Sequence, residues 1–78
     1  MRGLDGKNVI VTGGGGAIGG AICRRFASYG AKVGVFDRNI DGANKVAAEI
    51  GGHASGVDIA DYDAVGSAIL QFEREVGP

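Results

Sequence analysis

Glycine residues gather near the start of the chain, directly after a short β-branched run. Six of the eight residues from 13 to 20 are glycine, and Val9, Ile10 and Val11 precede them. Because glycine has no Cβ and tolerates positive φ, such a loop lets backbone N–H groups approach a bound phosphate closely. An apolar helix pattern follows, and the positive end of a helix dipole favours an anion. The residue types and their order therefore predict a strand, a phosphate-binding turn and a helix.

Asp37 is a second residue suited to ligand chemistry, because it ends an apolar run at residues 32–37 and lies 18 positions after Gly19. At this spacing in a dinucleotide-binding fold, a carboxylate accepts hydrogen bonds from the hydroxyls of the adenosine ribose. It would also repel a 2′-phosphate, which favours NAD over NADP. The neighbouring Arg38 can pair with a phosphate, but beside Asp37 we expect it to lie at most over or next to the adenine. The alternative for Asp37 is a surface acid in a turn.

The glycine tract fits more than one phosphate-binding pattern. Gly14-x-Gly16-x-x-Gly19 satisfies the general dinucleotide fingerprint, although a glycine-rich tract matches many patterns by chance. A P-loop would need Gly-Lys followed by Ser or Thr, whereas Gly19-Gly20-Ala21 provides neither. A nucleotide triphosphatase is therefore disfavoured, and a dinucleotide is the predicted ligand.

A second register of the same tract is Thr12-Gly13-x-x-x-Ala17-x-Gly19, preceded by the β-branched run at 9–11. It resembles the Thr-Gly-x-x-x-Gly-x-Gly signature of the short-chain dehydrogenase/reductase family, with Ala17 in place of the second glycine. The resemblance extends over nearly all 78 residues and implies NAD as the cofactor, with NADP less favoured. The cofactor-binding residues that it implies are Gly13, Gly15, Gly16, Ala17, Ile18, Gly19, Asp37, Arg38, Asp58 and Ile59.

Asp58 and Ile59 belong to this implied site because Val57-Asp58-Ile59 resembles the family's third-strand element. In that element an acid meets the adenine amino group, and the backbone of the next residue supports the ring. The alternative for Asp58 is a loop acid near the start of a helix. Ile18 is expected beneath the diphosphate, toward the nicotinamide, while it also belongs to the apolar stripe of its helix.

The resemblance implies an NAD-dependent oxidoreductase that interconverts a secondary alcohol and a ketone by hydride transfer. The family's catalytic Ser, Tyr-x-x-x-Lys and Asn-Asn-Ala-Gly motifs are absent, since Val33 and Gly66 stand four residues after Tyr29 and Tyr62. No residue of this chain is therefore expected to be catalytic. We expect a fragment, the N-terminal part of a protein that acts on a small-molecule alcohol or ketone as a homodimer or homotetramer. The alternatives are a non-catalytic nucleotide-binding module that senses NAD and an inactive structural fragment.

Apolar periodicity defines the elements that must position these residues. Strands are predicted at 7–12, 32–37 and 54–58, and helices at 18–29, at 41–50 and after Asp61, which can cap the last one. Strands that alternate with helices form parallel sheets through right-handed crossovers. We therefore predict one partial dinucleotide-binding domain over residues 1–78, with the order β-α-β-α-β-α and the strand order 3-2-1. This is the first half of a Rossmann-type, doubly wound α/β fold.

Each predicted helix carries an apolar stripe at the spacing of one helix face. The stripes are Ile18, Ile22, Phe26 and Tyr29 in the first helix, Ala43, Val46, Ala47 and Ile50 in the second, and Val65, Ile69, Phe72 and Val76 in the third. We expect the first two helices to share one face of the sheet and the third to cover the other alone. Cys23 is expected to be a packed thiol. His53 is expected in a loop or at a strand start.

The composition disfavours several classes of protein. Lys and Arg nearly balance Asp and Glu at a net charge of −1, which argues against a nucleic-acid-binding or polybasic membrane-binding role. No apolar run approaches the ~20 residues of a membrane span, and the N-terminus lacks a signal-peptide pattern, so a cytoplasmic protein is expected. Because Cys23 is the only cysteine, an internal disulfide and a multi-cysteine metal site are excluded.

Overall fold

The computed structural model describes residues 2–77 of the chain. Strands and helices alternate along it, as the apolar periodicity predicts. The strands are β1 (Asn8–Thr12), β2 (Lys32–Asp37) and β3 (His53–Gly56), and the helices are α1 (Ala17–Ser28), α2 (Ile40–Ile50) and α3 (Tyr62–Val76), with a 3-10 turn at Arg2–Leu4. Between residues 2 and 77, no helix is both long and apolar enough to cross a membrane.

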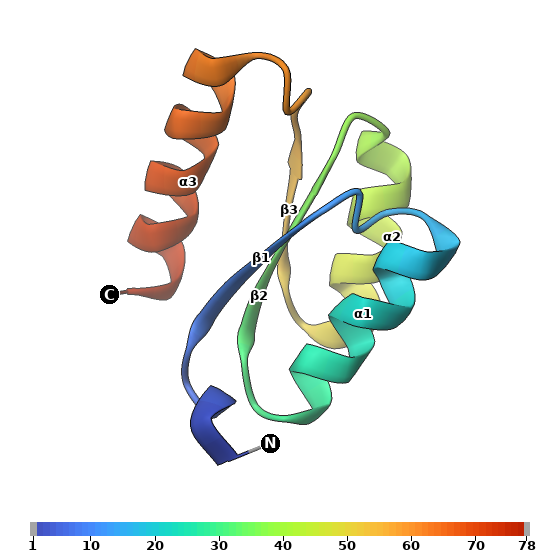
Figure 1. The fold of residues 1–78 in the computed structure, drawn as a ribbon, viewed down its shortest axis with the longest axis vertical. Helices are drawn as coiled ribbons and strands as arrows, with labels where there is room; N and C mark the ends of the chain where they lie inside the picture. The colour runs from blue at the N-terminus through green and yellow to red at the C-terminus, as the bar shows by residue number, and fades with distance from the viewer. Residues whose placement is uncertain (1, 78) are drawn as a thin grey trace.

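The three strands form one parallel sheet with β2 in the centre. β1 pairs with β2 from Asn8 opposite Lys32 to Thr12 opposite Phe36, and β3 pairs along the other edge of β2. The order β1-β2-β3 contains the same neighbours as the predicted order 3-2-1, read from the opposite edge. Because the strands are parallel, all three strand-to-helix loops lie at one end of the sheet, the upper end in Figure 1.

Two helices cover one face of the sheet and one helix covers the other, as expected. In Figure 1, α1 and α2 lie together on one side of the strands and α3 lies on the opposite side. Val33 and Val35 of β2 are buried in the cluster beneath α1 and α2, whereas Phe36 packs with Val57 and Phe72 on the α3 side. The buried residues of the larger cluster are Val11, Cys23, Val33, Val35, Ala43, Val46 and Ala47. β2 is thus buried on both faces, which explains its nearly continuous apolar run.

The predicted stripes of α2 and α3 face the core. Their buried members are Ala43, Val46, Ala47 and Phe72. Asp61 caps α3 as predicted, because its side-chain oxygen accepts a hydrogen bond from the backbone N–H of Ala64 at 3.1 Å. Gly51 ends α2 with a φ of 66°, a left-handed conformation that favours glycine.

The predicted core stripe of α1 is wrong at its first two positions. Ile18 and Ile22 remain 82% and 43% exposed, whereas the buried residues of this helix are Gly20 and Cys23. Gly20 lies against α2, since a Cβ at this position would stand 3.3 Å from Val46 Cγ2. α1 therefore approaches α2 along a face of small residues, and the spacing of its larger apolar residues does not mark the buried face.

The third strand lies slightly earlier than the predicted range 54–58. It begins at His53 and ends at Gly56, so His53 is a strand-start residue, one of the two positions expected for it. The prediction depended mainly on Val57, which is buried but follows the strand. The N–H of Val57 donates to the carbonyl oxygen of Asp37 at 2.9 Å. The chain therefore stays beside β2 for one residue beyond the end of β3.

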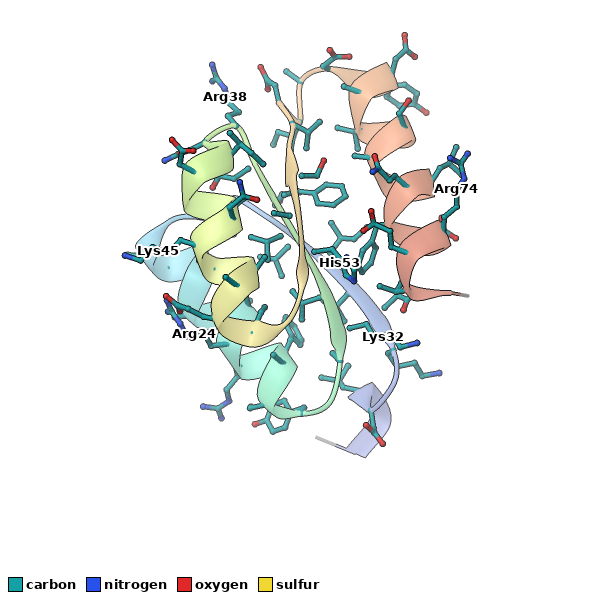
Figure 2. The ribbon with its side chains drawn as sticks, turned by 180° about the vertical axis from the view of Figure 1, so that it is seen from behind. Arg24, Lys32, Arg38, Lys45, His53 and Arg74 are labelled. Carbon is teal, nitrogen blue, oxygen red and sulfur yellow. The ribbon has the colours of Figure 1, made fainter. Side chains whose placement is uncertain are left out.

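The first residue of each strand contacts the C-terminal end of α3. The contacts are Asn8 Nδ2 with Gly77 O at 2.8 Å, Lys32 Nζ with Val76 O at 2.9 Å and His53 Nδ1 with Glu75 Oε2 at 2.7 Å. Figure 2 shows Lys32 and His53 toward this end of the sheet and Arg38 at the opposite end. The amino ends of the strands therefore hold α3, while their carboxyl ends carry the loops.

Phe72 anchors α3 to the sheet and is only 3% exposed. Replacing it with alanine (Phe72→Ala) removes its packing and leaves a cavity, so we expect the free energy of unfolding to fall by about 3–5 kcal/mol. Leu70→Ala is the matched control, because Leu70 lies on the same helix and is 56% exposed; its effect should be about 0.5 kcal/mol or less. Urea unfolding followed by circular dichroism measures both changes. Equal losses in the two variants would contradict this packing of α3.

Candidate functional site

The loop between β1 and α1 leaves the sheet at Gly13. This residue has a φ of 72°, in the region that favours glycine. The N–H groups of Gly13 and Gly14 both donate to the carbonyl oxygen of Phe36, at 2.7 and 3.2 Å. Because Phe36 directly precedes Asp37 in β2, the loop begins at a fixed position relative to that carboxylate.

Gly14 and Gly19 are two of the three tract glycines at which a side chain would collide with the fold. A Cβ at Gly14 would stand 2.9 Å from Val35 Cγ1 and 3.0 Å from Cys23 Sγ. A Cβ at Gly19 would overlap the carbonyl oxygen of Gly13. Packing alone therefore requires glycine at these two positions, because the loop lies directly on the sheet and on the first turn of α1.

The N-terminus of α1 faces this loop with donors that the helix does not use. Gly16 is the N-cap and offers no side chain to cap the helix, and the first intrahelical bond runs from Gly20 N–H to Gly16 O at 2.7 Å. The N–H groups of Ala17, Ile18 and Gly19 therefore have no acceptor within the helix. The first turn contains no acidic residue. The end of α1 is thus suited to a bound anion.

Asp37, at the end of β2, is joined directly to the glycine loop. Gly15 N–H donates to Asp37 Oδ2 at 2.9 Å, and Asn39 N–H donates to Asp37 Oδ1 at 2.9 Å. These two backbone donors orient the carboxylate. Because a carboxylate has about four lone-pair sites, positions remain for hydroxyl groups of a ligand.

A hollow of ≈ 140 Å³ lies beside this carboxylate. Its lining residues are Gly13, Asp37, Arg38, Val57 and Ile59. Val57 and Ile59 make part of the wall apolar, which suits a flat aromatic ring, while Asp37 provides hydrogen-bond acceptors at the rim. Arg38 Nε lies 3.8 Å from Asp58 Oδ2, and Figure 2 shows the Arg38 side chain pointing outward from the loop end of the sheet. The hollow therefore combines an apolar wall with a charged rim.

The structure brings most of the predicted site residues to one end of the sheet. Those around the loop and the hollow are Gly13, Gly15, Gly16, Gly19, Asp37, Arg38, Asp58 and Ile59. The backbone N–H groups of Ala17 and Ile18 also lie at this end, in the first turn of α1, whereas these two residues line an open apolar surface on that helix. Sequence reasoning missed Val57 as a lining residue of the hollow and Asn39 as one of the two residues whose N–H groups orient the Asp37 carboxylate. The signal for Asn39 is its place directly before an apolar helix pattern, where Asn is a frequent N-cap.

Cys23 lies beneath the loop and is fully buried, as expected of a packed thiol. Its Sγ stands 3.9 Å from the carbonyl oxygen of Gly14. Burial raises the pKa of the Cys23 thiol above its ordinary value of 9.0, while the charge of Arg24 acts in the opposite direction. The thiol is therefore neutral near pH 7 and supports the loop by packing.

This raised pKa makes stability depend on pH in the alkaline range. As the pH rises through 9.0, the thiol ionises in the unfolded chain before it ionises in the folded one, so folding becomes less favourable. Cys23→Ala removes this contribution, and we expect the variant to lose less free energy of unfolding than the wild-type chain between about pH 8 and about pH 10. Urea titrations across this range measure both slopes. Identical slopes would contradict the burial of the thiol.

Comparison with known proteins identifies relatives of this chain. Residues 7–78 match the family model described as short chain dehydrogenase. A short chain dehydrogenase of Pseudocercospora fijiensis is 42% identical over 80 residues, which cover 96% of this chain and 26% of that protein. D-threitol dehydrogenase of Mycolicibacterium smegmatis is 37% identical over 79 residues, which cover 95% of this chain and 30% of that protein.

A solved structure agrees with these sequence relatives. The 3-ketoacyl-(acyl-carrier-protein) reductase of Brucella melitensis, solved in complex with NADH, matches with a TM-score of 0.90 and 38% identity, over 95% of this chain and 31% of that chain. The chain thus spans about a quarter to a third of the length of these proteins, and its fold is Rossmann-like. Because the family model matches nearly the whole chain, this protein belongs to the short-chain dehydrogenase family.

Proposed function

We propose that this chain binds the adenosine diphosphate portion of NAD within an oxidoreductase that interconverts a secondary alcohol and a ketone. The hydrogen bond from Gly15 N–H to Asp37 Oδ2 carries this proposal. This bond places a glycine loop, which suits a diphosphate, directly beside a carboxylate, which suits ribose hydroxyls. Family membership supports the activity class, and the Brucella melitensis reductase that this chain resembles was solved with NADH.

The residues of the loop fit a diphosphate. Gly13 and Gly16 present no Cβ that would hold an anion away from the backbone, whereas the missing Cβ of Gly15 makes room for α2. At the start of α1, the N–H groups of Ala17 and Ile18 are free of intrahelical acceptors and would donate to the same anion. The chain would thus bind the diphosphate through backbone donors and the helix dipole, without a positively charged side chain.

The end of the sheet fits an adenosine. Asp37 would accept hydrogen bonds from the ribose hydroxyls at the positions that its two backbone donors leave open. The adenine ring would occupy the hollow that Val57 and Ile59 line, with Arg38 over or beside it. Asp58 would accept a hydrogen bond from the adenine amino group.

The negative charge of Asp37 favours NAD over NADP. A 2′-phosphate on the ribose would lie against this carboxylate, and like charges at such short range repel each other. Arg38 can attract a phosphate, but its guanidinium lies near Asp58 and its side chain is 78% exposed to water. Solvent weakens that attraction. The carboxylate therefore decides the preference.

NAD, when bound, supplies the hydride chemistry, and this chain's residues bind and orient its adenosine half. We propose that neither tyrosine transfers a proton in the reaction, because no lysine stands four residues after Tyr29 or Tyr62. We propose that the catalytic groups belong to a longer protein of which this chain is a part. The relative named D-threitol dehydrogenase supports an alcohol as the substrate.

Calorimetric titration of the chain with NAD and NADP tests the cofactor assignment. We expect saturable binding, with NAD bound more tightly than NADP. Asp37→Ala should weaken NAD binding about tenfold or more, because hydrogen bonds to a charged group are worth about 1.5–3 kcal/mol. It should weaken NADP binding less, since the variant also removes a repulsion.

Glu73→Ala is the control for the change in net charge. Glu73 is an exposed acid toward the C-terminal end of α3, away from the strand-to-helix loops. We expect this variant to bind both dinucleotides as the wild-type chain does. Tighter binding of NADP than of NAD by the wild-type chain would contradict the role of Asp37, and no binding of either would favour an inactive structural fragment.

A further inference from the structure

The first turn of α2 touches the glycine loop backbone to backbone. A Cβ at Gly15 would stand 2.7 Å from Ala43 N and 2.9 Å from the carbonyl carbon of Gly42. Conversely, a Cβ at Gly42 would stand 2.9 Å from the carbonyl oxygen of Gly15. Neither position can take a side chain unless one backbone moves away from the other. Gly15 and Gly42 are therefore complementary: each can lie where it does because the other has no Cβ.

The same turn also orients Asp37. Asn39 N–H donates to Asp37 Oδ1 at 2.9 Å, while Asn39 Oδ1 accepts a hydrogen bond from Gly42 N–H at 3.1 Å. On the other side, Gly15 N–H donates to Asp37 Oδ2 at 2.9 Å. Three hydrogen bonds thus connect Gly15, Asp37, Asn39 and Gly42, and close packing of Gly42 against Gly15 completes the ring. The first turn of α2 therefore contacts the carboxylate through Asn39 and the glycine loop through Gly42.

We infer that Gly42 is a positioning residue for the diphosphate loop, an inference that rests on the proposed function. Gly42 does not contact the ligand; it sets how closely Gly15 approaches α2. Gly16 follows Gly15 directly and is the N-cap of α1. The position of Gly15 therefore affects the position of the first N–H groups of α1, which have no acceptor within the helix. A methyl group at position 42 would displace this part of the loop. Hydrogen bonds weaken steeply when their geometry is disturbed, so the diphosphate would be bound less tightly.

Helix propensity and loop positioning predict opposite effects of an alanine at position 42. Gly42 lies within α2 and does not have a positive φ, so alanine there is favoured by helix propensity. Gly66 lies within α3, also without a positive φ, and a Cβ there would meet nothing within 4 Å. Both substitutions gain helix propensity, but only the one at position 42 pushes against the loop. Gly66→Ala is therefore the matched control.

ADP and adenosine distinguish a displaced loop from a general loss of structure, because adenosine lacks the diphosphate. We would titrate the wild-type chain, Gly42→Ala and Gly66→Ala with each ligand and follow binding by NMR. Gly42→Ala should weaken ADP binding about tenfold, equivalent to about 1.4 kcal/mol. It should weaken adenosine binding by less than about twofold, because Asn39 N–H still holds Asp37 Oδ1 when the loop is displaced. Gly66→Ala should leave both affinities unchanged.

Asn39 allows a milder change in the same turn if Gly42→Ala does not fold. Asn39→Ala removes the acceptor of Gly42 N–H and should also weaken ADP binding selectively, whereas Asn39→Ser keeps an acceptor and should restore the affinity. Equal weakening of ADP and adenosine binding, or unchanged ADP affinity in the folded variants, would overturn the inference. Absence of ADP binding to the wild-type chain would instead contradict the proposed function itself.

Discussion

Close contact between backbones, with no side chain between them, is the constraint on which this site depends. The glycine loop lies so near β2, α1 and α2 that a Cβ at Gly14, Gly15 or Gly19 would collide with a neighbour. This approach lets Gly15 N–H reach Asp37 and directs the loop into α1. A glycine-rich segment loses much conformational entropy on folding, so its shape must be held from outside. Three separate elements, β2, α1 and α2, hold it here, so the loop depends on the whole α1/α2 side of the sheet.

Most of the fold could be predicted because it depends on patterns within short stretches of sequence. Apolar periodicity marks the strands and helices, and their alternation implies the parallel sheet and the distribution of helices over its two faces. The buried face of α1 could not be predicted in this way. Ile18 and Ile22 carry the apolar period, yet Gly20 and Cys23 are the buried residues. How closely two helices pack decides which face is buried, and that distance depends on residues of α2 that are remote in sequence.

The site could be predicted as a set of residues but not as a set of connections. Spacing after the glycine tract marks Asp37, and the structure places it beside the loop. The bond from Gly15 to this carboxylate depends on how β2 lies against the loop, and the part played by Asn39 depends on the first turn of α2. Val57 lines the hollow because the chain continues beside β2 after β3 ends. The spacing of residues along the sequence predicts none of these contacts, because each one depends on how separate elements pack against one another.

The unequal division of the core affects how the molecule opens. The cluster beneath α1 and α2 is the larger, while Phe36, Val57 and Phe72 form the smaller one beneath α3. Regions with fewer buried apolar contacts open at lower free energy, so α3 would lift away first, while the glycine loop stays folded. Such an opening would uncover the sheet at Phe36 and offer an apolar surface for aggregation. The polar contacts of Asn8, Lys32 and His53 with the end of α3 oppose this opening only weakly, because they are exposed to solvent. The burial of Phe72 is therefore what keeps this apolar surface covered.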